Sequence, residues 1–199
     1  MPSAEDITRH DDVDPAGVEW VGDRPVASPI AVVEPDPSWP ARFDELAARI
    51  RRALGHRVLE LDHIGSTSVA DLPAKPIIDI DLTVADPGDE TAYVPALRRE
   101  GFALLIREPG WHGHRLLVAA APPANLHVWG PDAPEPIRHR LFRDRLRDHP
   151  DDRSRYADAK RTAAAAVNAA GGDVMAYNLR KQPVVRDILE RTFRAHGLR

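Results

Sequence analysis

The hydrophobic residues of this chain follow a helical repeat in one early segment and shorter, strand-like runs after it. Apolar residues from Phe43 to Leu54 recur at every third or fourth position, and this spacing predicts a helix that starts at Ser38 and ends at Gly55. Compact apolar runs predict strands at residues 30–33, 58–64 and 77–84. The first half of the chain is therefore expected to alternate strand and helix.

In the second half, the pattern predicts a hairpin followed by helices. Two apolar runs, 102–107 and 115–121, flank a Pro-Gly-Trp-His-Gly loop and predict paired strands, with a further strand at 126–129. Helices are predicted at 91–100, from Ile137 onward, at 151–170 and from about Pro183 to Ala195. Together these elements predict an α+β fold: a mixed β-sheet with helices packed on one side and a helical C-terminal part.

Composition narrows the class of protein. The 199 residues are 43% hydrophobic, which is enough for one domain to bury its own core. We see no apolar run of membrane-spanning length, no secretory leader and no cysteine. We therefore expect a cytoplasmic protein without disulfides and without a membrane partner. A net charge of −4 argues against a general nucleic-acid-binding protein.

Charge is distributed unevenly along the chain. Residues 1–25 carry seven acidic residues and two arginines and lack a periodic apolar face, which predicts a mobile or loosely docked acidic extension over residues 1–28. The domain itself is expected at residues 29–199. Residues 138–161 carry nine basic and five acidic side chains. Two interpretations of the extension remain open: a solvated acidic tail, or a tail that covers a basic cleft.

The candidate chemistry lies within residues 61–84. Side chains alternate along a strand, so Asp79 and Asp81 are expected on one face and the neighbouring isoleucines on the other. Two aligned carboxylates repel each other, and a bound cation is the simplest compensation. Mg²⁺ fits, because it takes oxygen ligands and keeps part of its shell for water and phosphate. The plainer alternative is two exposed polar positions on an edge strand.

A Gly-Ser-Thr-Ser turn precedes the carboxylate strand. Gly65 would let the backbone approach a phosphate closely, and Ser66 and Ser68 would supply hydroxyl donors beside it. The whole turn, Gly65, Ser66, Thr67 and Ser68, is therefore predicted to bind phosphate.

This arrangement resembles the nucleotidyltransferase superfamily, whose pattern is a hydrophobic residue, Gly-Ser, about a dozen residues and Asp-hydrophobic-Asp. Here it reads Ile64-Gly65-Ser66, twelve residues, and Asp79-Ile80-Asp81. A closer resemblance is to the GrpB-like family of bacterial proteins. Its hallmark, His-Ile-Gly-Ser-Thr-Ser-Val-Pro-Gly-Leu-x-Ala-Lys-Pro-Ile-Ile-Asp-Ile, is matched at residues 63–80, with Ala70-Asp71 in place of Pro-Gly.

The resemblance covers residues 30 to 195, nearly the whole chain. Residues 32–43 look like the opening segment of the family, residues 125–128 like a later strand, and blocks at 138–160 and 177–181 like its C-terminal helices. A similar domain follows the kinase domain in some bacterial dephospho-CoA kinases. The resemblance implies the nucleotidyltransferase fold and Mg²⁺-dependent transfer of a nucleotidyl group.

His127 stands where most nucleotidyltransferases place a third carboxylate. Histidine is a poor ligand for Mg²⁺ and a better one for zinc or manganese, so Mn²⁺ is the second candidate metal. Either two carboxylates hold the metal, or His127 acts as a base, or the site is not catalytic. The catalytic candidates are therefore Asp79, Asp81 and His127, and a structural, hydrogen-bonded His127 is the plain alternative.

Cationic and aromatic side chains supply the remaining candidates for nucleotide and phosphate contacts: Lys75, His139, Arg143, Lys160, Tyr177 and Lys181. His139 and Arg143 lie four residues apart on one helix face, where the fork of an arginine suits a triphosphate. Two Tyr-Lys pairs at the same spacing, ending at Lys160 and Lys181, are candidates for contacts to a base or a phosphate. The plainer alternative for His139 and Arg143 is a solvated helix face. The plainer alternative for the Tyr-Lys pairs is helix packing in which the lysine ammonium reaches water.

Two hypotheses follow from the sequence. The first is a metal-dependent nucleotidyltransferase that uses a nucleoside triphosphate and a small-molecule or protein acceptor. The second is a non-catalytic module of the same fold that binds a nucleotide or a CoA-like ligand. The surroundings of His127 discriminate between them, because a preformed metal site favours catalysis and a collapsed, salt-bridged one favours binding. The sequence predicts neither the acceptor, nor the nucleotide, nor the oligomeric state.

Overall fold

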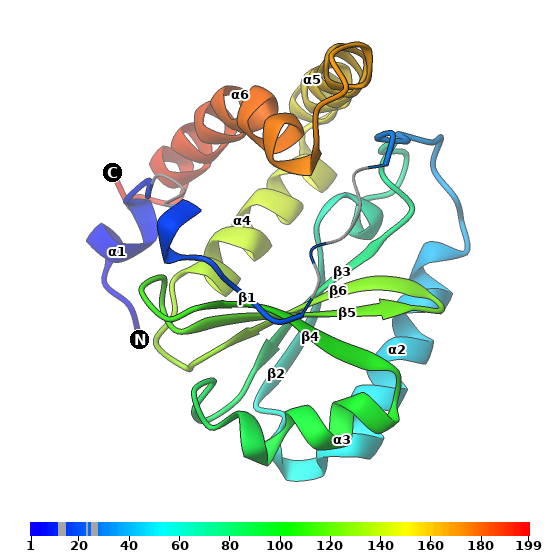
Figure 1. Ribbon diagram of the computed structural model, residues 1–199. Helices are drawn as coiled ribbons and strands as arrows, with labels where there is room; N and C mark the ends of the chain where they lie inside the picture. The colour runs from blue at the N-terminus through cyan, green and yellow to red at the C-terminus, as the bar shows by residue number, and fades with distance from the viewer. Residues whose placement is uncertain (12–14, 23, 25–27) are drawn as a thin grey trace.

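A six-stranded mixed β-sheet lies at the centre of the computed structural model, which describes residues 1–11, 15–22, 24 and 28–199 (Figure 1). The strand order is β1-β4-β5-β6-β3-β2; β3 and β6 run parallel, and the other neighbours are antiparallel. The strands are β1 (Glu19–Trp20), β2 (Glu60–Ile64), β3 (Ile78–Thr83), β4 (Phe102–Glu108), β5 (His114–Ala120) and β6 (Pro123–Trp129).

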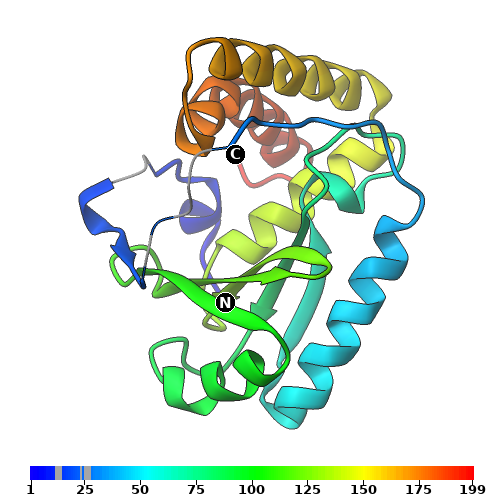
Figure 2. The same cartoon turned by 45° about the vertical axis from the view of Figure 1, so that its right-hand side comes forward.

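Helices cover both faces of the sheet. Helices α2 (Trp39–Leu54) and α3 (Val94–Arg99) pack on one face, and their apolar side chains form the main core with those of β3 and β6. The helical C-terminal part predicted from the sequence stands over the other face, as Figures 1 and 2 show. It consists of α4 (Glu135–Asp148), α5 (Pro150–Ala169) and α6 (Val174–Ala195). Within the described residues, no helix combines the length and apolar character that crossing a membrane requires.

The predicted elements are mostly confirmed, with three local corrections. Residues 30–33 do not form a strand; Val33 makes a single antiparallel bridge to Ala74. The helix expected at 91–100 is shorter, because Pro95 allows regular helix only from Val94, after one 3-10 turn. The last helix starts nine residues before Pro183, because Asp173 caps the N-terminal end of α6.

Strand β3 confirms the predicted alternation. Ile78, Ile80 and Leu82 are fully buried in the main core, whereas Asp79 and Asp81 lie on the face toward α4. The strand is not at the edge, since it pairs with β2 on one side and β6 on the other. The two carboxylates are therefore not exposed positions of an edge strand.

Parts of the N-terminal segment are docked on the domain. Helix α1 (Ala4–Thr8) buries Ile7 against the apolar residues of α6, and β1 pairs with β4. Buried Arg138 of α4 donates hydrogen bonds to the backbone oxygens of Ile7 and Arg9. The boundary at residue 28 stays a prediction, and these contacts dock the described parts of the segment on the domain.

Candidate functional site

The parallel pairing of β3 with β6 builds the centre of the site. Asp79 lies opposite Asn125 and Asp81 lies opposite His127, so the four polar side chains share one face of the sheet. The Asn125 amide donates a 2.8 Å hydrogen bond to Asp79 Oδ1. The sequence thus correctly placed His127 beside the carboxylates.

Asp81 is the more buried carboxylate, with 2% of its surface exposed. Its Oδ1 accepts a 2.8 Å hydrogen bond from the indole N–H of Trp129, and its Oδ2 lies 2.8 Å from Nδ1 of His139 on α4. Burial alone would raise the pKa of Asp81, but the charge and hydrogen bond of His139 lower it below its usual value. Burial likewise opposes protonation of His139, yet Asp81 raises the pKa of His139 to about 9. The two side chains form an ion pair at neutral pH.

This ion pair decides how well the predicted metal fits. Both oxygens of Asp81 already accept from N–H groups, and Oδ1 of Asp79 accepts from Asn125. A histidine cation compensates the charge that Mg²⁺ was expected to compensate. Asp79, Asp81 and His127 also do not form a three-residue ligand group within 4.8 Å among the described residues. The arrangement does not fit a Mg²⁺ centre, and metal binding by Asp79 and Asp81 stays a prediction.

The glycine that opens the predicted phosphate turn is required by Asp79. Gly65 has φ +67°, and a Cβ at this position would overlap Oδ2 of Asp79. The absence of a side chain therefore lets the turn lie directly against the carboxylate. The sequence predicted that the backbone of Gly65 approaches a phosphate closely. In the structure, this backbone lies against the carboxylate of Asp79.

The hydroxyl groups of the same turn have partners within the protein. Ser68 donates a 2.6 Å hydrogen bond to the carbonyl of Gly65, and Thr67 Oγ1 lies 3.0 Å from Nε2 of His63. Ser66 accepts a 3.0 Å hydrogen bond from the ammonium of Lys160. Ser66 is thus the hydroxyl of this turn that lies beside a cation, and phosphate binding by the turn stays a prediction.

All three lysines of the chain lie near one another, and two of them lie near Asp79. Asp79 interacts electrostatically with Lys75 and Lys160, and Lys181 interacts electrostatically with the same two lysines. The ammonium groups of Lys75 and Lys181 lie 5.5 and 4.9 Å from the ring centre of Tyr177. We call these three lysines with Tyr177 the lysine cluster. Four of the predicted phosphate-binding residues are therefore brought together.

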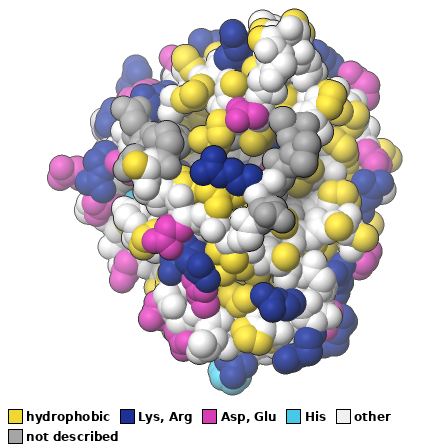
Figure 3. All heavy atoms as spheres, in the orientation of Figure 1, with side chains coloured by type: hydrophobic (Ala, Val, Ile, Leu, Met, Phe, Trp, Pro, Cys, Tyr) yellow, Lys and Arg dark blue, Asp and Glu magenta, His cyan; other side chains and the backbone are white. Residues whose placement is uncertain are grey.

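Lys160 is the most buried of the three lysines, with 2% of its surface exposed. Its ammonium group donates to Ser66 and to the carbonyl of Pro73, and lies 4.7 Å from the ring centre of Tyr156. Burial and the nearby Lys181 lower the pKa of Lys160 to about 7. An ammonium has three donors, and these two hydrogen bonds use two of them. Figure 3 shows Lys and Arg side chains near the middle of one face, between the C-terminal helices and the sheet, with hydrophobic side chains around them.

The arginines of α4 hold the turn and β2 in place. Arg143 donates to the carbonyl of His63 and to Asp144, and Arg147 donates to the carbonyl of Ser68. His139 contacts Asp81, whereas Arg143 contacts His63 and Asp144. The two side chains that were predicted to clamp a triphosphate therefore have separate partners within the protein. Contact of either residue with phosphate stays a prediction.

Sequence reasoning missed a hydrogen-bonded chain behind His127. His127 Nδ1 lies 3.0 Å from Nε2 of His114, whose Nδ1 lies 2.7 Å from Glu108. Trp129 also went unnoticed, although it follows Asn125 and His127 on the same face of β6. The alternation Asn125, His127, Trp129 was the signal that could have found it.

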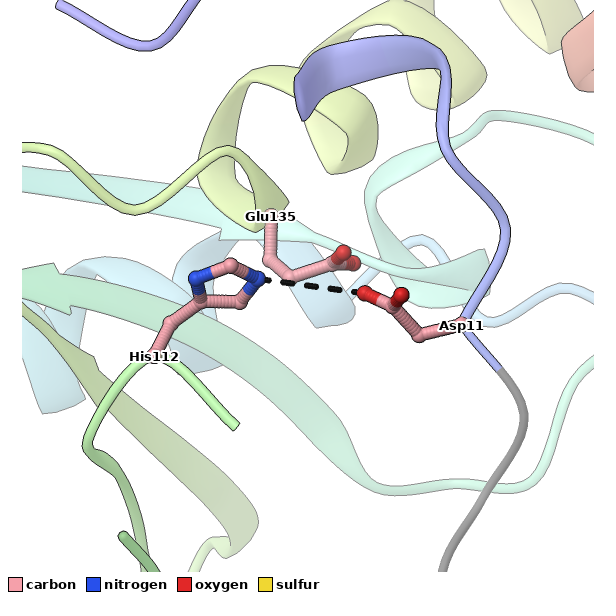
Figure 4. A group of neighbouring side chains, drawn as sticks. All are labelled: Asp11, His112 and Glu135. Atoms are coloured by element: carbon pink, nitrogen blue, oxygen red, sulfur yellow. Dashed lines mark ion pairs between the residues drawn. The ribbon is translucent and has the colours of Figure 1, made fainter. Parts of the chain in front are cut away.

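A second group of ionisable side chains lies at the edge of the domain (Figure 4). The side chains of Asp11, His112 and Glu135 converge there, and Nε2 of His112 lies 3.9 Å from Asp11. Arg9 lies 3.3 Å from Asp11 and Arg138 lies 3.2 Å from Glu135, so both carboxylates already have cationic partners. We interpret the group as part of the contact that docks the N-terminal segment.

Comparison with known proteins agrees with the fold and the hallmark segment. Residues 29–191 match the family described as GrpB protein. A UPF0157 protein of Halalkalibacterium halodurans is 44% identical over 168 residues, 84% of this chain and 85% of that protein. A dephospho-CoA kinase of Mycolicibacterium paratuberculosis is 32% identical over 193 residues, 83% of this chain but 46% of the kinase.

A solved structure supports the same assignment. The crystal structure of the conserved protein GrpB from Enterococcus faecalis matches with a TM-score of 0.69 and 28% identity, covering 82% of this chain and 99% of that one. The resemblance inferred from residues 63–80 is thus confirmed over most of the chain. This chain belongs to the GrpB family.

Proposed function

We propose that this protein is a binding module for a phosphate-bearing ligand, a nucleotide or a CoA-like molecule, whose phosphate lies at the lysine cluster. The observation that carries the proposal is that all three lysines of the chain lie near one another, two of them close to Asp79, with Lys160 bonded to Ser66 of the turn. Lys75 and Lys181 supply positive charge there, and a bound phosphate would favour the protonated form of Lys160.

The pairing of Asp81 supports binding over metal-dependent transfer. The carboxylate of Asp81 is paired with His139 and accepts a hydrogen bond from Trp129. This is the salt-bridged arrangement that favours a binding module over a metal site. The relatives named dephospho-CoA kinase support the inclusion of CoA-like ligands, although this chain spans less than half of such a protein.

Nucleotidyl transfer is the second candidate, and His127 is the observation in its favour. Its Nε2 has no hydrogen-bond partner among the described residues, whereas Nδ1 contacts His114. A ring nitrogen that is free on the side of the two carboxylates suits a general base. In that reaction, an acceptor hydroxyl would bond to the α-phosphorus of a nucleoside triphosphate and give its proton to the base, while pyrophosphate leaves.

Isothermal titration calorimetry with ATP, CoA and dephospho-CoA, each with and without Mg²⁺, tests the binding proposal. We expect at least one ligand to bind without Mg²⁺. Replacing Lys160→Met should weaken that binding at least tenfold, because a charge-assisted hydrogen bond contributes roughly 1.5–3 kcal/mol. Arg51→Met is the matched control, because Arg51 is exposed on α2, on the other face of the sheet.

Three outcomes separate the candidates. Binding that is unchanged in Lys160→Met moves the phosphate away from the lysine cluster. Absence of binding by all three ligands contradicts the proposed module. Release of pyrophosphate from a nucleoside triphosphate, lost in His127→Asn, replaces the binding module with the transferase.

A further inference from the structure

Glu108, His114 and His127 form a hydrogen-bonded chain across three neighbouring strands. Glu108 ends β4, His114 begins β5, and His127 lies near the end of β6, so the chain runs across the sheet toward β3. The two links measure 2.7 Å, from Glu108 Oε2 to His114 Nδ1, and 3.0 Å, from His114 Nε2 to His127 Nδ1. Neither hypothesis drawn from the sequence uses Glu108 or His114.

The central ring of this chain is fixed by its surroundings. His114 is 2% exposed, stacks on Trp129 at 4.3 Å between ring centres, and meets the edge of Trp111 at 5.1 Å. Such packing leaves the imidazole little freedom to turn and keeps bulk water away from its two hydrogen bonds. The direction of both bonds is therefore set by the groups at the two ends.

The hydrogen-bond donors then follow in order. An ionised Glu108 only accepts, so Nδ1 of His114 carries the proton that is shared with it. We take the buried His114 ring as neutral; its other nitrogen is then an acceptor, so Nε2 of His114 accepts from Nδ1 of His127, whereas a His114 cation would donate and reverse this order. His127 consequently carries its lone pair on Nε2.

The free nitrogen faces the candidate site. Nδ1 contacts His114 of β5, and the bonding directions of the two ring nitrogens diverge, so Nε2 points away from His114. His127 interacts electrostatically with Asp79, Asp81 and His139 there. A lone pair near two carboxylates is unfavourable unless a proton donor lies between them, and a ligand hydroxyl would be such a donor.

We propose that Glu108 and His114 are positioning residues that hold His127 in the tautomer protonated on Nδ1, which makes Nε2 the proton acceptor for a hydroxyl group of the bound ligand. The ligand itself rests on the proposed function, but the tautomer does not. Burial lowers the pKa of His127 to about 4, which agrees with a neutral ring at pH 7. In the transferase alternative, the same nitrogen would take the proton of the acceptor hydroxyl.

The tautomer of His127 in the ligand-free protein tests the inference directly. Long-range ¹H–¹⁵N correlation spectra at pH 7 distinguish a protonated Nδ1 from a protonated Nε2. The signals of His127 among the nine histidines are identified by their loss in His127→Asn. We expect Nε2 to be unprotonated in the wild-type protein. A protonated Nε2 would overturn the inference, whatever ligand the protein binds.

Removing the carboxylate of Glu108, the acceptor at the end of the hydrogen-bonded chain, gives a second test. Glu108→Leu should populate the other tautomer of His127, and Glu108→Gln, which keeps a weaker acceptor, should shift the balance less. Glu45→Gln, on α2 away from the chain, is the matched control and should change nothing. An unchanged tautomer in folded Glu108→Leu would contradict a positioning role. If that variant does not fold, the wild-type and Glu108→Gln spectra still decide the question.

Discussion

Asp79 and Asp81 stand two residues apart on the same face of β3, yet they are compensated by different kinds of cation. Asp79 is half-buried and lies near Lys75 and Lys160, the second of which donates to Ser66 of the Gly65 turn. Asp81 is almost fully buried and is paired with His139, with Trp129 on its other oxygen. On the proposed function, the lysine cluster takes up an anionic ligand, whereas Asp81 and His139 are paired with each other.

The difference indicates how a two-carboxylate strand can fold without a metal. Lys75 and Lys181 are only partly buried, whereas the histidine cation at His139 depends on the carboxylate beside it. On the proposed function, the position of Asp79 serves recognition of an anion, and the position of Asp81 is structural and sensitive to pH. The predictions below test this division, beginning with the largest expected effect.

Neutralising each carboxylate in turn should separate the two positions. Asp81→Asn leaves a buried histidine without its counterion and should lower the free energy of unfolding by about 3 kcal/mol at pH 7. Asp79→Asn should lower it by less than about 1 kcal/mol, because Asp79 is half-buried and partly screened by water. Urea unfolding of both variants measures the difference, and equal losses would contradict the division.

The pH dependence of stability should have opposite signs at the two positions. The pKa of His139 is raised from 6.5 to about 9, so its contribution is complete below pH 6.5 and is lost as the pH rises to 9. That loss amounts to about 3 kcal/mol, at 1.36 kcal/mol for each pH unit. The pKa of Lys160 is lowered from 10.5 to about 7, so its burial destabilises the folded state less as the pH rises from 7 to 10.5.

Because the two effects oppose each other in the wild-type protein, variants are needed to resolve them. His139→Asn should remove the loss of stability between pH 6.5 and 9, and Lys160→Met should remove the gain above pH 7. Unfolding curves at several pH values show both. A pH profile of His139→Asn that is parallel to the wild type over this range would show that the pair with Asp81 is not ionic.

The close approach of the turn to Asp79 predicts a smaller effect. Gly65→Ala places a Cβ both in a left-handed backbone conformation and against Oδ2 of Asp79, and should lower the free energy of unfolding by about 2 kcal/mol. Adding Asp79→Ala should recover only the part due to the clash and leave about 1 kcal/mol of backbone strain. Full recovery in the double variant would show that the carboxylate alone requires glycine.

The fold was largely predictable because its signals are local. Apolar repeats predicted α2, β3 and the hairpin of β4 and β5, and the cap at Gly55 predicted the end of α2. The start of α6 was not predictable from the sequence, because a proline inside a helical pattern normally indicates a helix boundary. Here the cap at Asp173 and the burial of Tyr177 stabilise the helix before Pro183.

The candidate site was predictable in its members but not in their pairing. Alternation placed Asp79 and Asp81 on one face, the resemblance to nucleotidyltransferases pointed to His127, and the hallmark drew attention to the turn. That His139 reaches Asp81 depends on how α4 lies over the sheet, which no local pattern specifies. For the same reason the link from Glu108 to His114 was missed, since it depends on strand register.

Divalent metal alone should have the smallest effect. Both oxygens of Asp81 are engaged, so millimolar Mg²⁺ or Mn²⁺ should shift the melting temperature of the wild-type protein by no more than roughly 1 °C, as expected when a ligand does not bind the folded state. His139→Asn frees Oδ2 of Asp81 and removes a competing cation, so the same ions should stabilise this variant measurably. Asp81→Asn combined with His139→Asn is the control and should lose that stabilisation. A clear Mg²⁺-dependent shift in the wild-type protein, abolished by Asp81→Asn, would show that the ion displaces His139 and would restore the metal-dependent transferase as the better account of this site.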